Sequence, residues 1–246
     1  MRGCKYGTHR VIGENVLPQP AKKINNEMNI YDNEVLIDVQ ALNIDSASFT
    51  QIEEECNNDI EKIKAKILEI VEEKGKMQNP VTGSGGMLIG TIEKIGSDLE
   101  GTIDLKIGDK IATLVSLSLT PLNIEEILDI KPDIDRVEIK GKAILFESGI
   151  YAKLPTDMEE TLALAALDVA GAPAQTQKLV KEGNSVLILG AAGKSGMLCC
   201  YEARKKAGKE GKVIGVVINS KDAEFIKEND LVDEAIIVDA QILMQF

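Results

Sequence analysis

The stretch VLILGAAGKSGMLCCYEA, residues 186–203, constrains the fold of this chain more than any other. An apolar run ends there in a glycine-rich turn, and the turn opens into a segment with helical spacing. The chain then continues as a strand-like run at 212–218, a helical run at 221–229 and a strand-like run at 234–240. Alternation of this kind is typical of βαβ units on a parallel sheet. This part of the chain therefore predicts an α/β domain of the Rossmann type.

The turn carries a variant of the dinucleotide-binding pattern G-x-G-x-x-G. Ala191 stands at the first glycine position and is followed by Gly193 and Gly196. Because the turn follows an apolar strand and opens a helix, free N–H groups and the positive helix end can face a pyrophosphate. A glycine-rich turn without a ligand is the alternative. The residues expected to bind the cofactor are Gly190, Ala192, Gly193, Lys194, Ser195, Gly196, Asn219 and Ser220.

The choice of cofactor depends on the end of the second strand of this domain. An acidic residue about 20 residues after the turn would bind the ribose hydroxyls of NAD. The chain has Asn219 and Ser220 there, and the Asn219 amide can serve the hydroxyls as a neutral donor and acceptor. No arginine stands beside them to receive a 2′-phosphate, although Lys221 is near. The sequence therefore favours NAD over NADP.

The part of the chain before Leu179 is organised differently. There β-type runs alternate with turn signals, at 33–42, 87–96, 108–117 and 143–154. They predict a mostly antiparallel, barrel-like unit. A helical run interrupts them at 58–76 with Gly75 as its expected end, and a second helix at 158–180 is expected to bend near Gly171 and Pro173. We therefore predict an α+β, barrel-like catalytic domain over 1–155 and an incomplete α/β Rossmann domain with three parallel strands over 156–246.

The composition excludes several classes of partner. A net charge of −12 and a pI near 4.7 argue against nucleic acid and anionic membrane surfaces, which need clustered lysine and arginine. No apolar run is long enough to span a bilayer, and the first residues lack the apolar core of a signal peptide, so a cytoplasmic protein is expected. The four cysteines show no C-x-x-C spacing, which indicates neither a disulfide framework nor a cysteine-rich zinc site.

Two segments of the first domain resemble those of the medium-chain dehydrogenase and reductase superfamily, in which a barrel-like, GroES-like domain precedes a nucleotide-binding domain. NPVTGSGGMLIGTIEKIG and LKIGDKIATL are similar to its G-H-E…G-x-V-x-x-V-G and G-D-x-V segments. Longer runs look like those of one family within it, the L-erythro-3,5-diaminohexanoate dehydrogenases: GTHRVI, VLPQPA, LNIDSASFTQIEEE, ILFESGIYAKLP and LDVAGAPAQT. The resemblance covers nearly the whole chain.

This resemblance implies a reaction as well as a fold. Members of the family are understood to oxidise 3,5-diaminohexanoate with NAD to 5-amino-3-oxohexanoate, with release of ammonia, in the fermentation of lysine. An NAD-dependent oxidoreductase that acts on a small diamino acid and forms a homodimer is therefore expected.

The chain departs from the zinc-dependent members of the superfamily at both metal-ligand positions. The run NIDSAS stands in place of the first-ligand cysteine, and the G-H-E motif is replaced by Gly85, Gly86 and Met87. Glycine and methionine cannot ligate zinc as histidine, cysteine or a carboxylate would. The single histidine, His9, lacks partner ligands and is expected to be a structural or surface residue. We expect no catalytic zinc.

A diamino acid needs carboxylates for its ammonium groups and a donor for its own carboxylate. The expected catalytic residues are Asp45, Ser46, Glu147 and Asp168. The first two stand at the superfamily's catalytic position, whereas for Asp168 a capping role at a helix break stays open. The run 53–55 is expected to be mostly solvated, with one glutamate turned inward. Arg10 or Lys153 could meet the substrate carboxylate.

The last residues raise a second hypothesis. A complete dinucleotide-binding fold has two βαβαβ halves, whereas here the third strand is followed at once by QILMQF. The chain would then be truncated, an inactive remnant that self-associates through an exposed sheet edge and an apolar tail. Loss of one nucleotide from codons for DATDPDAIL would produce the observed DAQILMQF, so a frameshift is our hypothesis for this tail.

Overall fold

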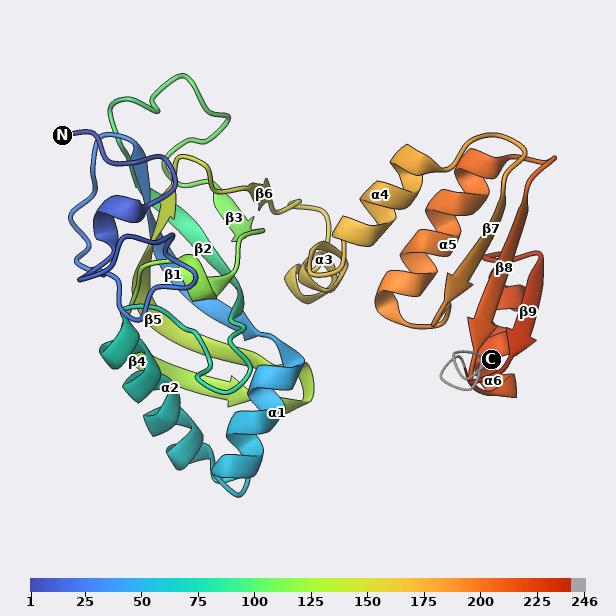
Figure 1. Ribbon diagram of the computed structural model, residues 1–246, viewed down its shortest axis with the longest axis horizontal. Helices are drawn as coiled ribbons and strands as arrows, with labels where there is room; N and C mark the ends of the chain where they lie inside the picture. Colours follow the sequence, from blue (N-terminus) through green and yellow to red (C-terminus); the bar gives the residue numbers. More distant parts are fainter. Residues whose placement is uncertain (240–246) are drawn as a thin grey trace. The chain divides into compact units, whose positions relative to one another are not determined.

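The computed structural model describes residues 1–239 of the chain. The chain divides into two compact units, Met1–Pro155 and Thr156–Phe246 (Figure 1). Within the described residues, no helix combines the length and the apolar character needed to cross a membrane. The hypotheses about the tail, its frameshift origin and its pairing with another chain, fall on residues 240–246 and lie outside the described part.

The first unit is built on a six-stranded sheet whose neighbouring strands are all antiparallel, in the order β4-β5-β1-β2-β3-β6. The strands are β1 (Glu34–Ile44), β2 (Gly86–Ile95), β3 (Lys110–Thr113), β4 (Leu122–Lys131), β5 (Arg136–Phe146) and β6 (Tyr151–Lys153). The registers of β1 with β2 and with β5 both shift between Val39 and Ala41, and such a bulge bends a strand. The expectation of a mostly antiparallel unit is confirmed.

Two helices, α1 (Ser46–Glu55) and α2 (Ile60–Lys74), follow β1 (Figure 1). The Asp59 carboxylate caps the start of α2 by accepting hydrogen bonds from two backbone N–H groups, and the helix ends at Gly75, whose φ of 72° is left-handed. The predicted helix and its end at Gly75 are confirmed. Apolar side chains of both helices join those of the strands in one core, among them Ile37, Phe49, Ile63, Ile67, Leu88 and Ile111.

The second unit contains a parallel sheet in the order β7-β8-β9, formed by β7 (Ser185–Leu189), β8 (Lys212–Val217) and β9 (Glu234–Ile237). Its helices are α3 (Glu160–Leu167), α4 (Gly171–Leu179), α5 (Lys194–Ala207) and α6 (Ser220–Glu228). The predicted alternation of strand and helix is confirmed. The predicted bend of the long helix is a complete break at 168–170, directly before Gly171.

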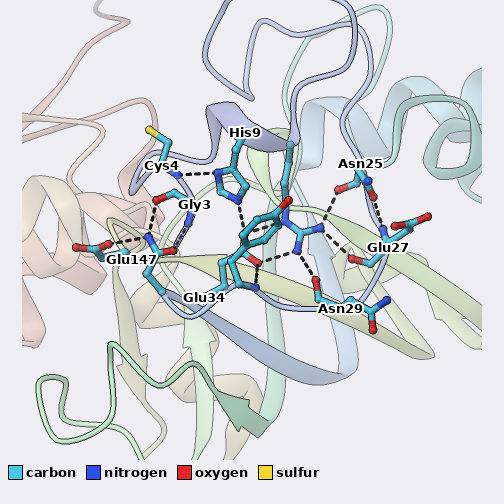
Figure 2. A network of polar contacts seen from close by, with 11 residues as sticks. Gly3, Cys4, His9, Asn25, Glu27, Asn29, Glu34 and Glu147 are labelled. Atoms are coloured by element: carbon cyan, nitrogen blue, oxygen red, sulfur yellow. Dashed lines mark hydrogen bonds and ion pairs between the residues drawn. The ribbon is translucent and has the colours of Figure 1, made fainter. Parts of the chain in front are cut away.

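A buried polar cluster fixes the N-terminal segment to the start of β1 (Figure 2). Arg10 donates through Nε and Nη2 to the two oxygens of Glu34, both at 2.7 Å, and its other N–H groups reach the carbonyls of Asn25, Glu27 and Asn29. His9 accepts the N–H of Cys4 at Nδ1, so Nε2 carries the proton that it donates to Glu34 at 2.9 Å. The guanidinium of Arg10 therefore binds groups of the protein itself, and the expectation that Arg10 meets the substrate carboxylate is wrong.

The charge of Glu34 stabilises this cluster. Burial alone would raise the pKa of Glu34, but hydrogen bonds from Arg10, Tyr31 and His9 and the charge of Arg10 together hold it below its ordinary value. Because the folded-state pKa lies below the unfolded one, this contribution is present above the unfolded pKa and is lost as the pH falls through the folded one.

We expect Glu34→Gln to lower the free energy of unfolding by about 2–3 kcal/mol at neutral pH, since it leaves the guanidinium of Arg10 buried without its anion. Urea unfolding measures the loss, and the difference from the native chain should shrink as the pH falls through the folded-state pKa of Glu34. Glu126→Gln, at an exposed position of β4, is the matched control. Equal unfolding free energies of the Glu34 variant and this control would contradict the assignment.

Lys76 is a second buried charge of the first unit. Its side chain is fully buried, and Nζ donates to the carbonyls of Pro18 and Gln19 at 2.6 and 2.8 Å. Burial, together with the charge of Lys74, lowers the pKa of Lys76 to about 8, although Glu14 opposes the shift. The lysine thus ties residues 18–19 to the end of α2 at an electrostatic cost.

Lys76→Met should remove a pH dependence of stability. Since the folded-state pKa lies below the unfolded one, the unfolded chain binds more protons between them, and the native chain gains up to about 3 kcal/mol as the pH rises through that interval. Urea unfolding at about pH 7.5 and about pH 9.5 should show this gain in the native chain and in the exposed control Lys94→Met, but not in Lys76→Met. The same gain in all three proteins would refute the assignment.

Candidate active site

Asp45 lies at the corner where β1 ends and α1 begins. Its backbone carbonyl accepts the N–H groups of Ser48 and Phe49, but its side chain does not cap the helix. Instead Oδ2 accepts the N–H of Gly85 at 3.1 Å. Among residues 1–239, Oδ1 has no hydrogen-bond partner, and the residue is half-buried. The corner therefore presents a fixed carboxylate with one oxygen available.

Two glycines let the start of β2 approach this corner. A Cβ on Gly85 would lie 2.5 Å from the backbone nitrogen of Ser118 and 2.7 Å from the carbonyl of Met77. A Cβ on Gly86, whose φ is +112°, would lie 2.0 Å from the carbonyl of Asn43. A residue with a Cβ would therefore clash with the backbone at either position. The described residues contain no group of three or more His, Cys, Asp or Glu side chains placed to hold a metal. The absence of a catalytic zinc stays a prediction.

Acidic side chains surround the start of α1. The Ser46 hydroxyl donates to the carboxylate of Asp135, a residue of the turn between β4 and β5 that sequence reasoning missed. Burial and the charges of Asp135 and Asp133 raise the pKa of Glu53. Glu53 is half-buried while Glu54 and Glu55 are exposed, so the inward turn expected for one glutamate of this run is confirmed. The local charge favours a cationic ligand.

A hydrogen-bonded loop supports the same corner. The hydroxyl of Ser48, which is fully buried, lies 2.5 Å from those of Thr82 and Ser84. Asn79 donates to the Ser48 carbonyl at 3.1 Å and accepts the N–H groups of Val81 and Thr82. These bonds fix residues 79–85 against α1, and they thereby fix the N–H of Gly85 that Asp45 accepts.

An apolar cavity lies beside the end of β5 that pairs with the start of β1. Ser118 lies against Gly85, and its neighbours line this cavity of about 240 Å³. The apolar side chains that line it are Leu17, Val115, Leu119, Ile144, Leu145 and Phe146. A cavity of this size holds only a small apolar group, such as a short aliphatic chain.

Two other sequence candidates have structural roles. Glu147 accepts hydrogen bonds from Arg2 at 2.9 and 3.0 Å and from Asn33 at 2.8 Å, so it holds the N-terminal segment. Figure 2 shows Glu147 beside Gly3. Glu147 follows the end of β5 that pairs with the start of β1, whereas Asp45 follows the other end of β1. The two carboxylates therefore lie toward opposite ends of β1, and the catalytic role of Glu147 stays a prediction. Lys153 is paired with Asp104 and Asp109, at 3.0 and 3.1 Å, and its role as a ligand of the substrate carboxylate stays a prediction.

The glycine turn of the second unit has the geometry of an anion site. Gly190 has a φ of 69°, and a Cβ on Gly196 would lie 2.1 Å from its carbonyl, so only glycine lets α5 begin this close to β7. Gly193 is the N-cap of α5, and its side is open, since a Cβ there would meet only the Gly190 carbonyl at 3.5 Å. Glycine has no side chain that could cap the helix, so the N-cap residue leaves the first N–H groups of α5 to face a ligand.

The other predicted cofactor residues lie on the same unit. Ala192 belongs to the turn, and Lys194 and Ser195 form the first turn of α5. Asn219 caps α6 by accepting the N–H of Asp222 at 2.8 Å, and its amide donates to the Asp222 carboxylate at 2.9 Å. The spacing N-x-x-D before a helix is a signal that sequence reasoning missed. The cofactor roles of Asn219 and Ser220 stay predictions.

Asp168 lies where α3 ends. Its Oδ2 is 4.0 Å from Nζ of Lys194, so the structure brings it to the glycine turn. A substrate contact and a capping role were both open for this residue, and the contact with Lys194 adds a third. Asp45 and Ser46 belong to the first unit and Asp168 to the second.

Comparison with known proteins decides the family. The family model of the L-erythro-3,5-diaminohexanoate dehydrogenase N-terminal domain matches residues 9–155. The chain belongs to this family. A relative named L-erythro-3,5-diaminohexanoate dehydrogenase, from Acetoanaerobium sticklandii, is 77% identical over 98% of this chain and 71% of the relative. Another of the same name, from Fusobacterium nucleatum subsp. nucleatum, is 72% identical over 97% of this chain and 70% of the relative.

The fold of the chain is also similar to that of a solved oxidoreductase outside this family. A solved mycobacterial quinone oxidoreductase is 16% identical, with a TM-score of 0.50 over 89% of this chain and 55% of that chain. This likeness shows a shared fold alone, and the chain spans about half the length of the oxidoreductase. The two dehydrogenase relatives favour an enzyme over the inactive, self-associating remnant.

Proposed function

We propose that this chain takes part in the NAD-dependent oxidative deamination of L-erythro-3,5-diaminohexanoate to 5-amino-3-oxohexanoate, with Asp45 in the substrate site. The observation that carries the proposal is the joint presence of family membership and a dinucleotide turn with an open, uncapped helix start. The finer fold assignment follows from it: a GroES-like catalytic domain, then an incomplete Rossmann domain. A cytoplasmic homodimer acting in lysine fermentation completes the proposal.

The residues of the turn fit a dinucleotide. Gly190, Gly193 and Gly196 keep side chains away from the start of α5, so its N–H groups can bind the pyrophosphate. Bound NAD would supply the hydride acceptor. Asp222 places a carboxylate beside the end of β8, where a 2′-phosphate would be repelled. This charge supports NAD over NADP.

The corner at Asp45 fits the substrate. Loss of hydride from a carbon that bears an amine requires the nitrogen to be unprotonated, and water then adds to the substrate iminium before ammonia leaves. The available Oδ1 of Asp45 can hold the ammonium and accept its proton, while the Gly85 N–H keeps Oδ2 in place. Ser46 and Asp135 extend the polar side of the corner.

The proposal is tested by mixing the chain with NAD and L-erythro-3,5-diaminohexanoate and following the absorbance of reduced nicotinamide together with ammonia release. Equal amounts of both products, and none with NADP, are expected. The same assay on the chain extended with the C-terminal part of the Acetoanaerobium relative determines whether a longer nucleotide-binding unit is needed. If neither protein forms product, the proposed substrate is wrong.

A further inference from the structure

A loose ion pair lies beside the glycine turn. Nζ of Lys194 is 4.0 Å from Oδ2 of Asp168, and the two side chains are 63% and 29% exposed. A pair this long and this exposed contributes little to stability. Lys194 can therefore leave Asp168 for a stronger anionic partner at small cost.

The position of Lys194 indicates what that partner is. Lys194 is the first residue of α5, where a cation is unfavourable because the helix dipole is positive at this end. No acidic residue occupies the first turn to offset it. Side chains of a helix lean toward its N-terminus, so the ammonium is carried toward the same space that the free N–H groups face. An anion bound there would interact favourably with the ammonium of Lys194 and with the first N–H groups of α5.

We propose that Lys194 exchanges Asp168 for the diphosphate of the dinucleotide, and that Asp168 is the counter-ion that holds Lys194 while no dinucleotide is bound. The inference rests on the proposed function of the glycine turn. It places Asp168 on the cofactor side of the reaction, as a positioning residue for Lys194 and not as a substrate ligand. The ammonium then supplies the salt-sensitive part of dinucleotide affinity.

Calorimetric titration of the chain with ADP, NAD and adenosine tests the exchange. Lys194→Gln should weaken ADP and NAD about tenfold, the effect of losing one charge-assisted hydrogen bond, and should leave adenosine unchanged. Lys194→Arg should restore most of the affinity. Asp168→Asn should tighten ADP about two- to threefold, because the resting competitor is gone. The salt dependence of ADP binding should fall in Lys194→Gln.

Lys206→Gln is the control, an exposed lysine near the other end of α5, and it should leave all three affinities unchanged. Native ADP affinity in Lys194→Gln would overturn the exchange while the turn stays a cofactor site. Weaker ADP binding in Asp168→Asn would overturn the counter-ion role. If the native chain binds neither ADP nor NAD, the proposed cofactor site fails and this inference fails with it.

Discussion

Gly193→Asp is expected to weaken NAD binding more than about a hundredfold while the second unit stays folded. A carboxylate at this position repels the pyrophosphate, and its oxygens bond the same N–H groups of α5 that the pyrophosphate needs. The fold should tolerate it, because aspartate is among the preferred N-cap residues and a Cβ on Gly193 would meet only the Gly190 carbonyl, at 3.5 Å. Folding and binding are thereby separated in one variant.

Calorimetry gives the affinity for NAD, and thermal unfolding shows that the unit is intact. Gln177→Asp is the matched control, since it adds the same charge to the same unit at an exposed position of α4. This control should bind NAD as the native chain does. Unchanged affinity in Gly193→Asp would remove the glycine turn from the cofactor site.

Local sequence signals predicted the elements that depend on local interactions. The start and the end of α2 have local signals, the capping residue Asp59 and the terminating Gly75. The βαβ pattern of the second unit follows from the periodicity of its apolar residues. The strand β4 was missed because its run LNIEEILDIK is rich in glutamate and aspartate, which are poor strand formers. Its pairing with β5 at the edge of the sheet makes it a strand.

Boundaries were less predictable where tertiary contacts decide them. The predicted run 143–154 combines the end of β5 with β6, which are separated by a turn at residues 147–150. Helix α1 was not predicted, because its run SASFTQIEEE has few apolar residues, and its burial depends on Phe49 and Ile52 reaching the core. Such contacts join segments far apart in the chain.

Candidate site residues could be predicted where a sequence motif marks their position. The partners of charged side chains could not, because the fold determines them. Asp45 was predicted because it stands beside a recognisable family segment, and its catalytic role stays a prediction. Arg10 and Glu147 look like free charges in the sequence, and only the fold pairs them with Glu34 and with Arg2. Asp135 reaches the same corner from a turn 89 residues after Ser46, a separation that leaves no local signal.

Asp45→Asn should reduce kcat/KM for 3,5-diaminohexanoate a hundredfold or more. The substitution keeps the size of the side chain, and one amide oxygen can still accept the Gly85 N–H. It removes the charge that would pair with the substrate ammonium and the base that would take its proton. Loss of one partner of a buried ion pair costs about 3–5 kcal/mol, which corresponds to at least this reduction. The affinity for NAD should hardly change, because Asp45 and the glycine turn belong to different units.

The kinetics are measured on the chain extended with the C-terminal part of the Acetoanaerobium relative, so that the nucleotide-binding unit has the length found in that dehydrogenase. Asp38→Asn removes the same charge from an exposed position of β1 and should leave kcat/KM unchanged. Near-normal turnover by Asp45→Asn would instead assign Asp45 to fixing Gly85, and Glu53 and Asp135 would become the carboxylates to test for the substrate ammonium.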